Sequence, residues 1–210
     1  MFQEEFDRQV ENLLQKRYHE IAGETAEAFT QQLEPLRERL EVLYLPAPDL
    51  ERGRLPFVIV VKSELVAAEQ AMVLVEWEGK SGISKMYPRE PRDFNTVDGI
   101  NLPTGVAYVL VDIDRGKESI NMTPNEALSR LEKENLSPLT IDEGIAIVTH
   151  YPEFLMKNNC FSLLASRYGG DKRVPAIWIN GQKRANLGWC WAGNPHTWLG
   201  SASCRSRAGV

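Results

Sequence analysis

The sequence lacks any long hydrophobic run, and this absence limits what the protein can be. No apolar stretch approaches the roughly 20 residues that a membrane-spanning helix needs, so no membrane partner is expected. The first residues, MFQEEFDRQ, contain no basic region followed by an apolar one and do not resemble a secretory signal. The three cysteines are odd in number and too few for a disulfide framework. Together these absences predict a cytoplasmic protein with reduced thiols.

Several familiar functional motifs are also missing. Gly79-Lys80-Ser81 resembles the end of a P-loop, but the glycine that the motif requires would fall at Leu74. The chain contains no GxGxxG and no HExxH, and no GxSxG surrounds its C-terminal serines. The sequence therefore gives no indication of a nucleotide site, a zinc protease or a serine hydrolase. It identifies no cofactor.

The residues that are present are unevenly distributed. The formal net charge is −5 over 210 residues, but residues 157–210 carry about +7 and residues 1–156 about −12. All three cysteines and four of the five tryptophans lie in the basic segment, which is where chemistry should be sought. Mutual packing of the two parts explains the asymmetry equally well. The basic residues are scattered and no RNA-binding signature occurs, so nucleic acid is not the expected partner.

Residues 1–44 are expected to form a helical arm. Apolar residues recur every three or four positions from Phe2 to Leu43, which is the period of an amphipathic helix. Gly23 weakens the helix and Pro35 kinks or restarts it, so two helices or one bent helix fit the pattern. The apolar stripe is expected to pack on its own domain, and a homodimer through residues 2–44 is the alternative. A proline-rich connector, residues 45–56, follows.

Residues 57–210 are expected to form one α/β or α+β domain, a mixed sheet with packed helices. Apolar runs predict strands over 57–61 and 108–113, and weaker patterns predict strands over 83–87 and 161–166. Capping boxes at Thr123 and Thr140 predict helices that end near Asn135 and before Pro152. Ser63 is expected to cap a further helix that extends to about residue 76.

An Asn-Gly pair at 180–181 separates two alternating runs, 174–179 and 182–191, and this pattern predicts a β-hairpin. A two-residue turn would pair Trp178 with Lys183 and place Trp178, Trp189 and Trp191 on one face of the sheet. That face is expected to be core. A floor for a cationic or planar ligand is the alternative.

The segment 188–203, GWCWAGNPHTWLGSAS, contains most of the candidate functional residues. Asn194 would cap a helix beginning at Pro195, and such a helix start could hold an anion between His196 and Arg205. The leading hypothesis is therefore a small-molecule site for an anionic or amphipathic ligand, with possible enzymatic activity. Its predicted ligand-binding residues are Trp189, Trp191, Asn194, Trp198 and Arg205.

A thiol- or zinc-dependent enzyme is the second hypothesis. Cys190 could be a nucleophile with His196 as its base, which makes these two the candidate catalytic residues. Cys160, Cys190, His196 and Cys204 also form a conceivable Cys3His zinc set, but their spacing matches no common finger and no metal site is assigned. The alternative to a nucleophile and to a zinc site is that the cysteines are buried and unreactive. A third hypothesis is an interaction protein that assembles through its N-terminal helices.

Five segments of the chain resemble a bacterial family of unknown function. They are PTGVAYVLVDID at 103–114, SPLTIDEGIAIVTH at 137–150, CFSLLASR at 160–167, RVPAIW at 173–178 and the segment 188–203. The resemblance covers about residues 55–207 and leaves out the N-terminal helices. It implies no activity, cofactor or catalytic residue, so it does not decide whether the protein is an enzyme.

Overall fold

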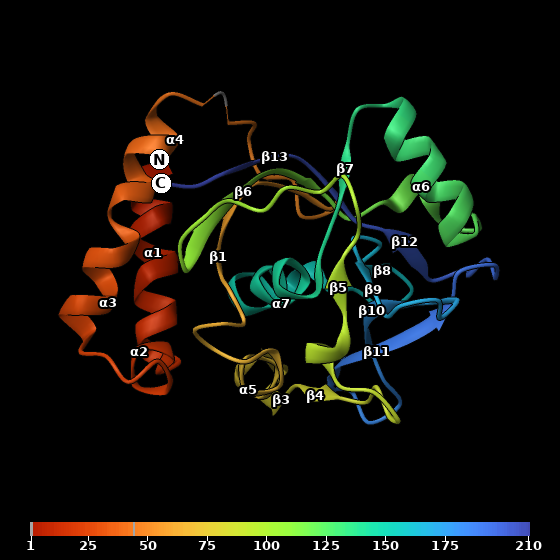
Figure 1. Cartoon of the computed structure of the whole chain (residues 1–210), viewed down its shortest axis with the longest axis horizontal. Coiled ribbons are helices and arrows are strands. Elements are labelled where there is room, and N and C mark those ends of the chain that lie inside the picture. The colour runs from red at the N-terminus through yellow and green to blue at the C-terminus, as the bar shows by residue number, and fades with distance from the viewer. Residues whose placement is uncertain (1, 44) are drawn as a thin grey trace.

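Two β-sheets form the framework of the computed structural model, which describes residues 2–43 and 45–210 (Figure 1). The first sheet is antiparallel and contains, in spatial order, β1 (Arg54–Val61), β6 (Ala107–Asp114), β13 (Ser203–Ala208) and β7 (Ser137–Pro138). The second is mixed, with the order β12 (Leu199–Ser201), β8 (Cys160–Ser162), β10 (Arg173–Ile179), β11 (Ala185–Trp191) and β4 (Ile83–Ser84). The expected mixed sheet with packed helices is confirmed.

Short elements connect these sheets. Two small ribbons pair β2 (Glu76–Trp77) with β3 (Lys80–Ser81), and β5 (Asn95–Thr96) with β9 (Ser166–Arg167). Three 3-10 turns are η1 (Pro91–Asp93), η2 (Lys117–Ser119) and η3 (Pro152–Phe154). No helix of the described residues is long and apolar enough to cross a membrane.

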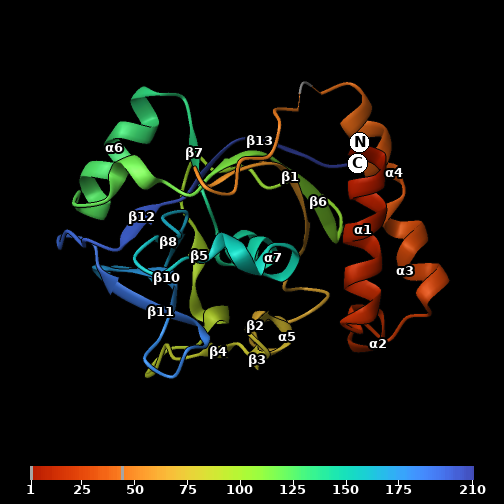
Figure 2. The same ribbon diagram turned by 180° about the vertical axis from the view of Figure 1, so that it is seen from behind.

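The helix α7 (Ile141–His150) packs against β1 of the first sheet and β10 of the second, and it appears at the centre of the molecule in Figures 1 and 2. All of its residues except Asp142 are buried, as an apolar sequence such as IDEGIAIVTH requires. Its start is the predicted capping box, in which Thr140 Oγ1 accepts the Glu143 amide at 3.3 Å. The same motif at Thr123 starts α6 (Pro124–Lys133). Both predicted helix starts are confirmed.

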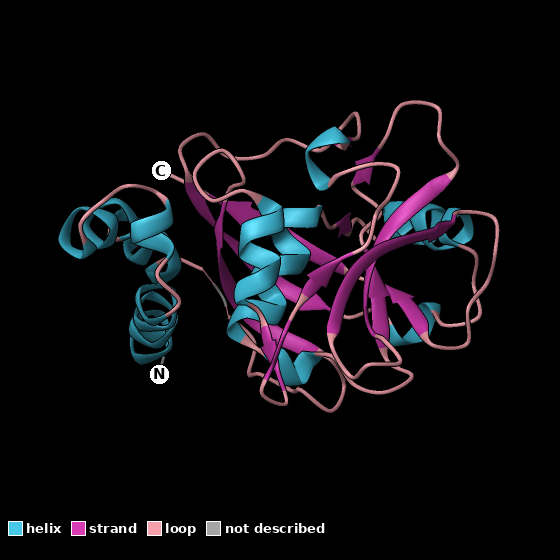
Figure 3. Ribbon diagram, turned by 90° about the horizontal axis from the view of Figure 1, so that it is seen from below, coloured by secondary structure: helices cyan, strands magenta, loops and turns pink. Residues whose placement is uncertain are grey.

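The N-terminal region forms four helices, α1 (Phe2–Gln15), α2 (Tyr18–Ile21), α3 (Ala26–Leu33) and α4 (Pro35–Glu41). They lie together on one side of the molecule (Figures 2 and 3). Pro35 occupies the first position of α4, where the missing amide hydrogen costs nothing, so it restarts the helix. The apolar residues of these helices, Phe6, Leu13, Phe29 and Leu36 among them, belong to the same core cluster as the sheets. The apolar stripe is therefore covered by the chain itself.

Gln9 joins α1 to the outer strand of the first sheet. Its Oε1 accepts the Ile59 amide at 2.7 Å, and its Nε2 donates to the Phe57 carbonyl at 3.3 Å. These are the two bonds that a neighbouring strand would make. Part of the free edge of β1 is thereby satisfied by a side chain, as exposed strand edges commonly are in native proteins.

Three predicted elements differ from the structure. The helix expected from Ser63 is the shorter α5 (Ala68–Leu74), with Ala67 at its N-cap, because the amides of Leu65 and Val66 donate to the Lys62 carbonyl and close a turn before the helix. The strand expected over 83–87 is limited to β4, and the one over 161–166 is divided between β8 and β9.

The β10–β11 hairpin exists, but its predicted register is wrong. Trp178 pairs with Asn186, and Lys183 has a positive φ of 54°. The turn is longer than two residues because Asn180 Oδ1 accepts the amides of Gln182 and Arg184. A type I turn followed by a left-handed residue is the usual geometry of such loops. The shift places Trp178 on the opposite face of the sheet from Trp189 and Trp191.

Candidate functional site

An open groove of about 1250 Å³, which we call the tryptophan groove, lies on the surface of the described structure. Its walls are the β2–β3 ribbon, the chain after η3, the β10–β11 hairpin and the loop before β12. The ribbon is held to the hairpin by two bonds, from Lys80 Nζ to the Gln182 carbonyl at 3.0 Å and from Arg184 Nε to the Ser81 carbonyl at 2.7 Å. Segments about 100 residues apart in sequence are thus held together around the groove.

Three indole rings line the tryptophan groove, those of Trp77, Trp178 and Trp198. Trp178 and Trp198 lie edge to face with 5.9 Å between ring centroids. Trp77 is oriented by its Nε1, which donates to the Leu155 carbonyl at 3.4 Å. Gly188 is needed beneath Trp178, because a Cβ at that position would lie 2.2 Å from the ring. All three rings are only partly buried, so the groove exposes aromatic surface to solvent.

Charged side chains of both signs lie on the rim of the tryptophan groove. Glu76, Glu78 and Glu153 line it at the β2–β3 ribbon and η3, and none of them forms an ion pair with a described residue. The same three carboxylates also line the adjoining hollow next to α1. Lys157 and Lys183 contribute two exposed ammonium groups. The groove therefore combines an apolar floor with unpaired carboxylates.

The structure leaves His196 outside the groove and lacks the helix predicted to begin at Pro195. His196 lies against Trp198, with 5.4 Å between ring centroids, but among the described residues it does not line the groove. The His196 Nε2 atom is buried without a hydrogen-bond partner in the described structure. Asn194 and Pro195 are exposed and lie in a loop without helical structure, so the predicted helix start is wrong. The turn at 191–194 is closed instead by the Asn194 amide, which donates to the Trp191 carbonyl.

The other predicted ligand-binding residues lie elsewhere. Arg205 is on the first sheet, where its Nε donates to Asp112 at 3.0 Å. Trp189 is stacked under Arg173, whose guanidinium carbon is 3.4 Å from the ring centroid. Trp191 is 54% exposed on the same face as Trp189. The groove thus contains only Trp198 of the predicted set.

The cysteines have the environment of inert thiols. Burial raises the pKa of Cys190 to about 11 and that of Cys204 to about 12, and burial also raises the pKa of Cys160. A thiolate nucleophile requires the opposite shift. Within residues 2–43 and 45–210, no group of three or more His, Cys, Asp or Glu side chains could hold a metal ion. The zinc hypothesis therefore has no geometric basis in the described residues.

A family model matches residues 12–210, and its description is a family of unknown function, DUF5701. The chain belongs to this family. No curated protein and no solved structure matches the chain. The DUF5701 match begins within α1, so it includes most of the helical region that the sequence resemblance left out. Every residue that lines the tryptophan groove lies inside the matched range.

Sequence reasoning missed half of the groove. Trp77 is the one tryptophan outside the C-terminal third, and it stands between two glutamates. A tryptophan between two acidic residues could have indicated a site for a cationic group. Its distance of about 100 residues from Trp178 concealed their proximity, because only the tertiary fold brings the ribbon and the hairpin together.

Proposed function

We propose that this member of DUF5701 binds an amphipathic ligand in the tryptophan groove, with an apolar or planar body on the rings and a cationic group beside the carboxylates. The observation that carries the proposal is the partly exposed Trp178–Trp198 pair in the same groove as three glutamates that form no ion pair with a described residue. Solvent-exposed indole surface of this kind is costly unless something covers it. The proposed ligand is amphipathic, as the sequence predicts, but its site is the tryptophan groove and not the segment 188–203.

A cation fits the groove better than an anion. The anionic ligand was predicted from a helix beginning at Pro195 and from Arg205 beside it. The structure has no helix there, and Arg205 lies on the first sheet, outside the groove. Indole faces attract cations by about 0.5–2 kcal/mol, and carboxylates add to that attraction. Lys16 also acts on Glu76 electrostatically, but its Nζ donates to the Leu74 carbonyl at 2.9 Å. A cytosolic setting is part of the proposal, since all three cysteines are free.

Benzyltrimethylammonium tests the proposal, because it combines a planar body with a cation that cannot donate hydrogen bonds. We expect it to quench tryptophan fluorescence and to bind at least about tenfold more weakly to W178A and to the double variant E78Q/E153Q, a loss of about 1.4 kcal/mol. The matched control is W191A, which removes an exposed ring outside the groove and should bind normally.

Benzenesulfonate supplies the comparison of charge, since it has a similar planar body with the opposite sign. Tighter binding of benzenesulfonate than of benzyltrimethylammonium would show that the groove prefers an anionic ligand, which contradicts the proposal. Equal affinity of W178A and the unmodified protein for both probes would exclude the groove as the site.

A further inference from the structure

A smaller hollow, of about 410 Å³, adjoins the tryptophan groove on the side of α1. We call it the α1 hollow. Glu76, Glu78, Pro152 and Glu153 line both hollows, so the carboxylates of the groove stand at the boundary between them. Beyond that boundary the lining comes mainly from polar side chains of α1 and from the end of α7. A ligand on the tryptophan rings can therefore extend past the carboxylates into the α1 hollow.

Most polar side chains of the α1 hollow already have partners within the protein. Arg8 donates to Glu5 through Nε at 2.8 Å and through Nη2 at 2.7 Å, so this carboxylate neutralises its charge. Asn12 Nδ2 donates to the Thr149 carbonyl at 3.0 Å and lies 3.2 Å from His150 Nδ1. Burial lowers the pKa of His150 to about 3, so its ring is neutral at pH 7. None of these side chains offers an uncompensated charge to a ligand.

Lys16 is the exception in the α1 hollow. Its Nζ donates to the Leu74 carbonyl at 2.9 Å, which uses one of the three donors of an ammonium group. It forms no ion pair with a described residue, although the charge of Glu76 acts on it from the boundary. The side chain is partly buried, and burial lowers the pKa of Lys16. A partly desolvated ammonium group with donors to spare attracts an anion more strongly than one in bulk water.

The chemistry of the two hollows thus changes in a fixed order, from indole rings to carboxylates and then to the ammonium group of Lys16. We propose that the ligand of the tryptophan groove is a zwitterion, with an anionic group that extends into the α1 hollow and binds Lys16. This inference rests on the proposed function, which places the aromatic body and the cation in the groove. The ligand class is that of betaines and similar inner salts, in which the cation separates the apolar body from the anion.

A pair of matched probes tests the inference on the full chain. Benzyldimethylpropylammonium and 3-(benzyldimethylammonio)propane-1-sulfonate share the benzyl ring, the quaternary nitrogen and the propyl chain, and they differ in the terminal sulfonate. We expect the sulfonate probe to bind at least about tenfold more tightly in calorimetric titration at pH 7, a gain of about 1.4 kcal/mol. The net charge of −5 by itself predicts the opposite order, because an acidic protein attracts a cation more than a neutral zwitterion.

K16M should abolish this preference, because it removes the ammonium group and retains an apolar side chain of similar length. We expect the two probes to bind K16M with affinities that differ by about twofold or less. The preference is a ratio measured on one protein, so a partial loss of folded K16M affects both probes equally. The matched control is K172M, which removes an exposed ammonium group outside both hollows and should retain the preference.

Four results would contradict the inference. Equal affinity of the unmodified protein for the two probes would overturn it and leave the proposed function intact, because the cation still binds. A preference that survives in K16M would show that Lys16 does not bind the sulfonate. Loss of the preference in K157M/K183M would place the sulfonate at the rim of the tryptophan groove. Failure of both probes to bind would refute the proposed function, and this inference with it.

Discussion

The contact between α1 and the first sheet differs from the tryptophan groove in how its polar groups are treated. At α1, Gln9 satisfies two backbone groups of β1, and Asn12 Nδ2 lies 3.2 Å from His150 Nδ1 while it donates to the Thr149 carbonyl at 3.0 Å. In the groove, three carboxylates have no described ion-pair partner and three indole rings remain partly exposed. We call the first region closed, because its polar groups are hydrogen-bonded within the protein, and the second open, because its carboxylates and rings face solvent.

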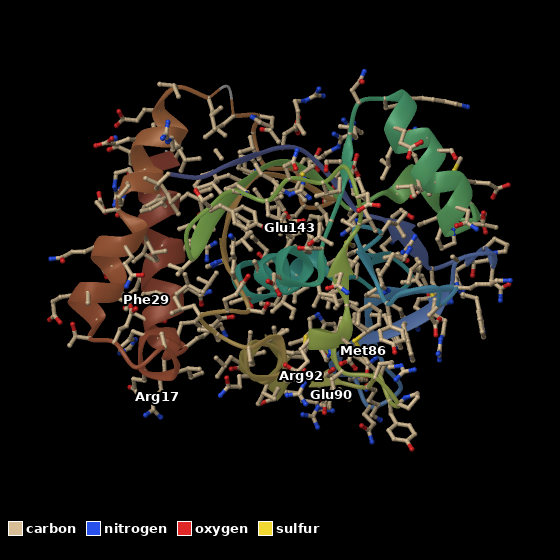
Figure 4. All side chains as sticks on the ribbon, in the orientation of Figure 1. Arg17, Phe29, Met86, Glu90, Arg92 and Glu143 are labelled. Carbon is tan, nitrogen blue, oxygen red and sulfur yellow. The ribbon has the colours of Figure 1, made fainter. Side chains whose placement is uncertain are left out.

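The chain thus uses polar side chains for stability at α1 and leaves the carboxylates of the groove without ion-pair partners. Buried polar groups in native proteins normally have partners. The three carboxylates of the groove are exposed instead, so water satisfies them and they remain available to a ligand. The contact of α7 with the first sheet is closed in the same way: the carboxylate of Glu143, at the centre of Figure 4, accepts Arg207 Nε at 2.5 Å and the Tyr108 hydroxyl at 2.8 Å. Substitutions should therefore lower stability in the closed region and change binding in the open one.

The largest expected effect is that of R207A. It leaves the fully buried Glu143 without its ion-pair partner, and such a loss destabilises by about 3–5 kcal/mol. Urea unfolding measures the change. The control is R205A, on the same strand, which breaks an exposed pair with Asp112 and should cost less than about 1 kcal/mol. Equal effects of the two substitutions would remove the contrast between buried and exposed polar contacts.

Q9A should have the next largest effect. It leaves the Ile59 amide and the Phe57 carbonyl of β1 without their partner, which costs about 1–3 kcal/mol. The exposed Q15A, which loses one bond to Glu11 within the same helix, is the control and should be nearly neutral. Hydrogen exchange at Ile59 should accelerate in Q9A alone. Unchanged exchange there would show that α1 does not protect the edge of β1.

The pH dependence of stability has two opposing contributions. Burial lowers the pKa of His150 from 6.5 to about 3, so the unfolded state takes up a proton first and stability decreases as the pH falls below about 6.5. Burial raises the pKa of Asp142 from 3.8 to about 6, so its contribution to stability increases as the pH falls through that range. The two nearly cancel between about pH 4 and 6.

D142N separates these two contributions, because it removes the titration of Asp142 and does not change His150. Its stability should decrease toward low pH by up to about 1.4 kcal/mol per pH unit, more steeply than that of the unmodified protein. Urea unfolding at pH 4, 5, 6 and 7 measures both slopes. Identical slopes would mean that Asp142 has an ordinary pKa in the folded protein.

G188A should have the smallest effect on stability, about 1 kcal/mol, since the new methyl group displaces a partly exposed ring. That ring is Trp178, and its displacement should change the tryptophan fluorescence and weaken binding of benzyltrimethylammonium. The control is G170A, in the loop before β10 and outside the groove, where an added Cβ meets no atom within 4 Å. A normal emission spectrum and normal binding in G188A would show that Trp178 is not a fixed wall of the groove.

Local patterns predicted many elements because their causes are local. The capping boxes at Thr123 and Thr140 start helices as expected, and the apolar runs form β1 and β6. The hairpin register failed because side-chain bonds from Asn180 lengthened the turn. The expected cap at Ser63 failed because the chain closes a turn there, in which the Leu65 and Val66 amides donate to the Lys62 carbonyl. In both cases a hydrogen bond that the sequence pattern does not show replaced the expected one.

By itself, the amino-acid sequence determined the fold class, the two helix starts and the strands on which the core is built. Periodicity, capping residues and apolar runs act over a few neighbouring positions, so these features do not depend on the rest of the chain. The tertiary structure alone decided that Trp77 and Trp178 line the same groove, that Arg205 binds Asp112 on the first sheet and that Asp142 lines a cleft. Such proximities result from long-range packing and from buried polar groups that must find partners across the fold.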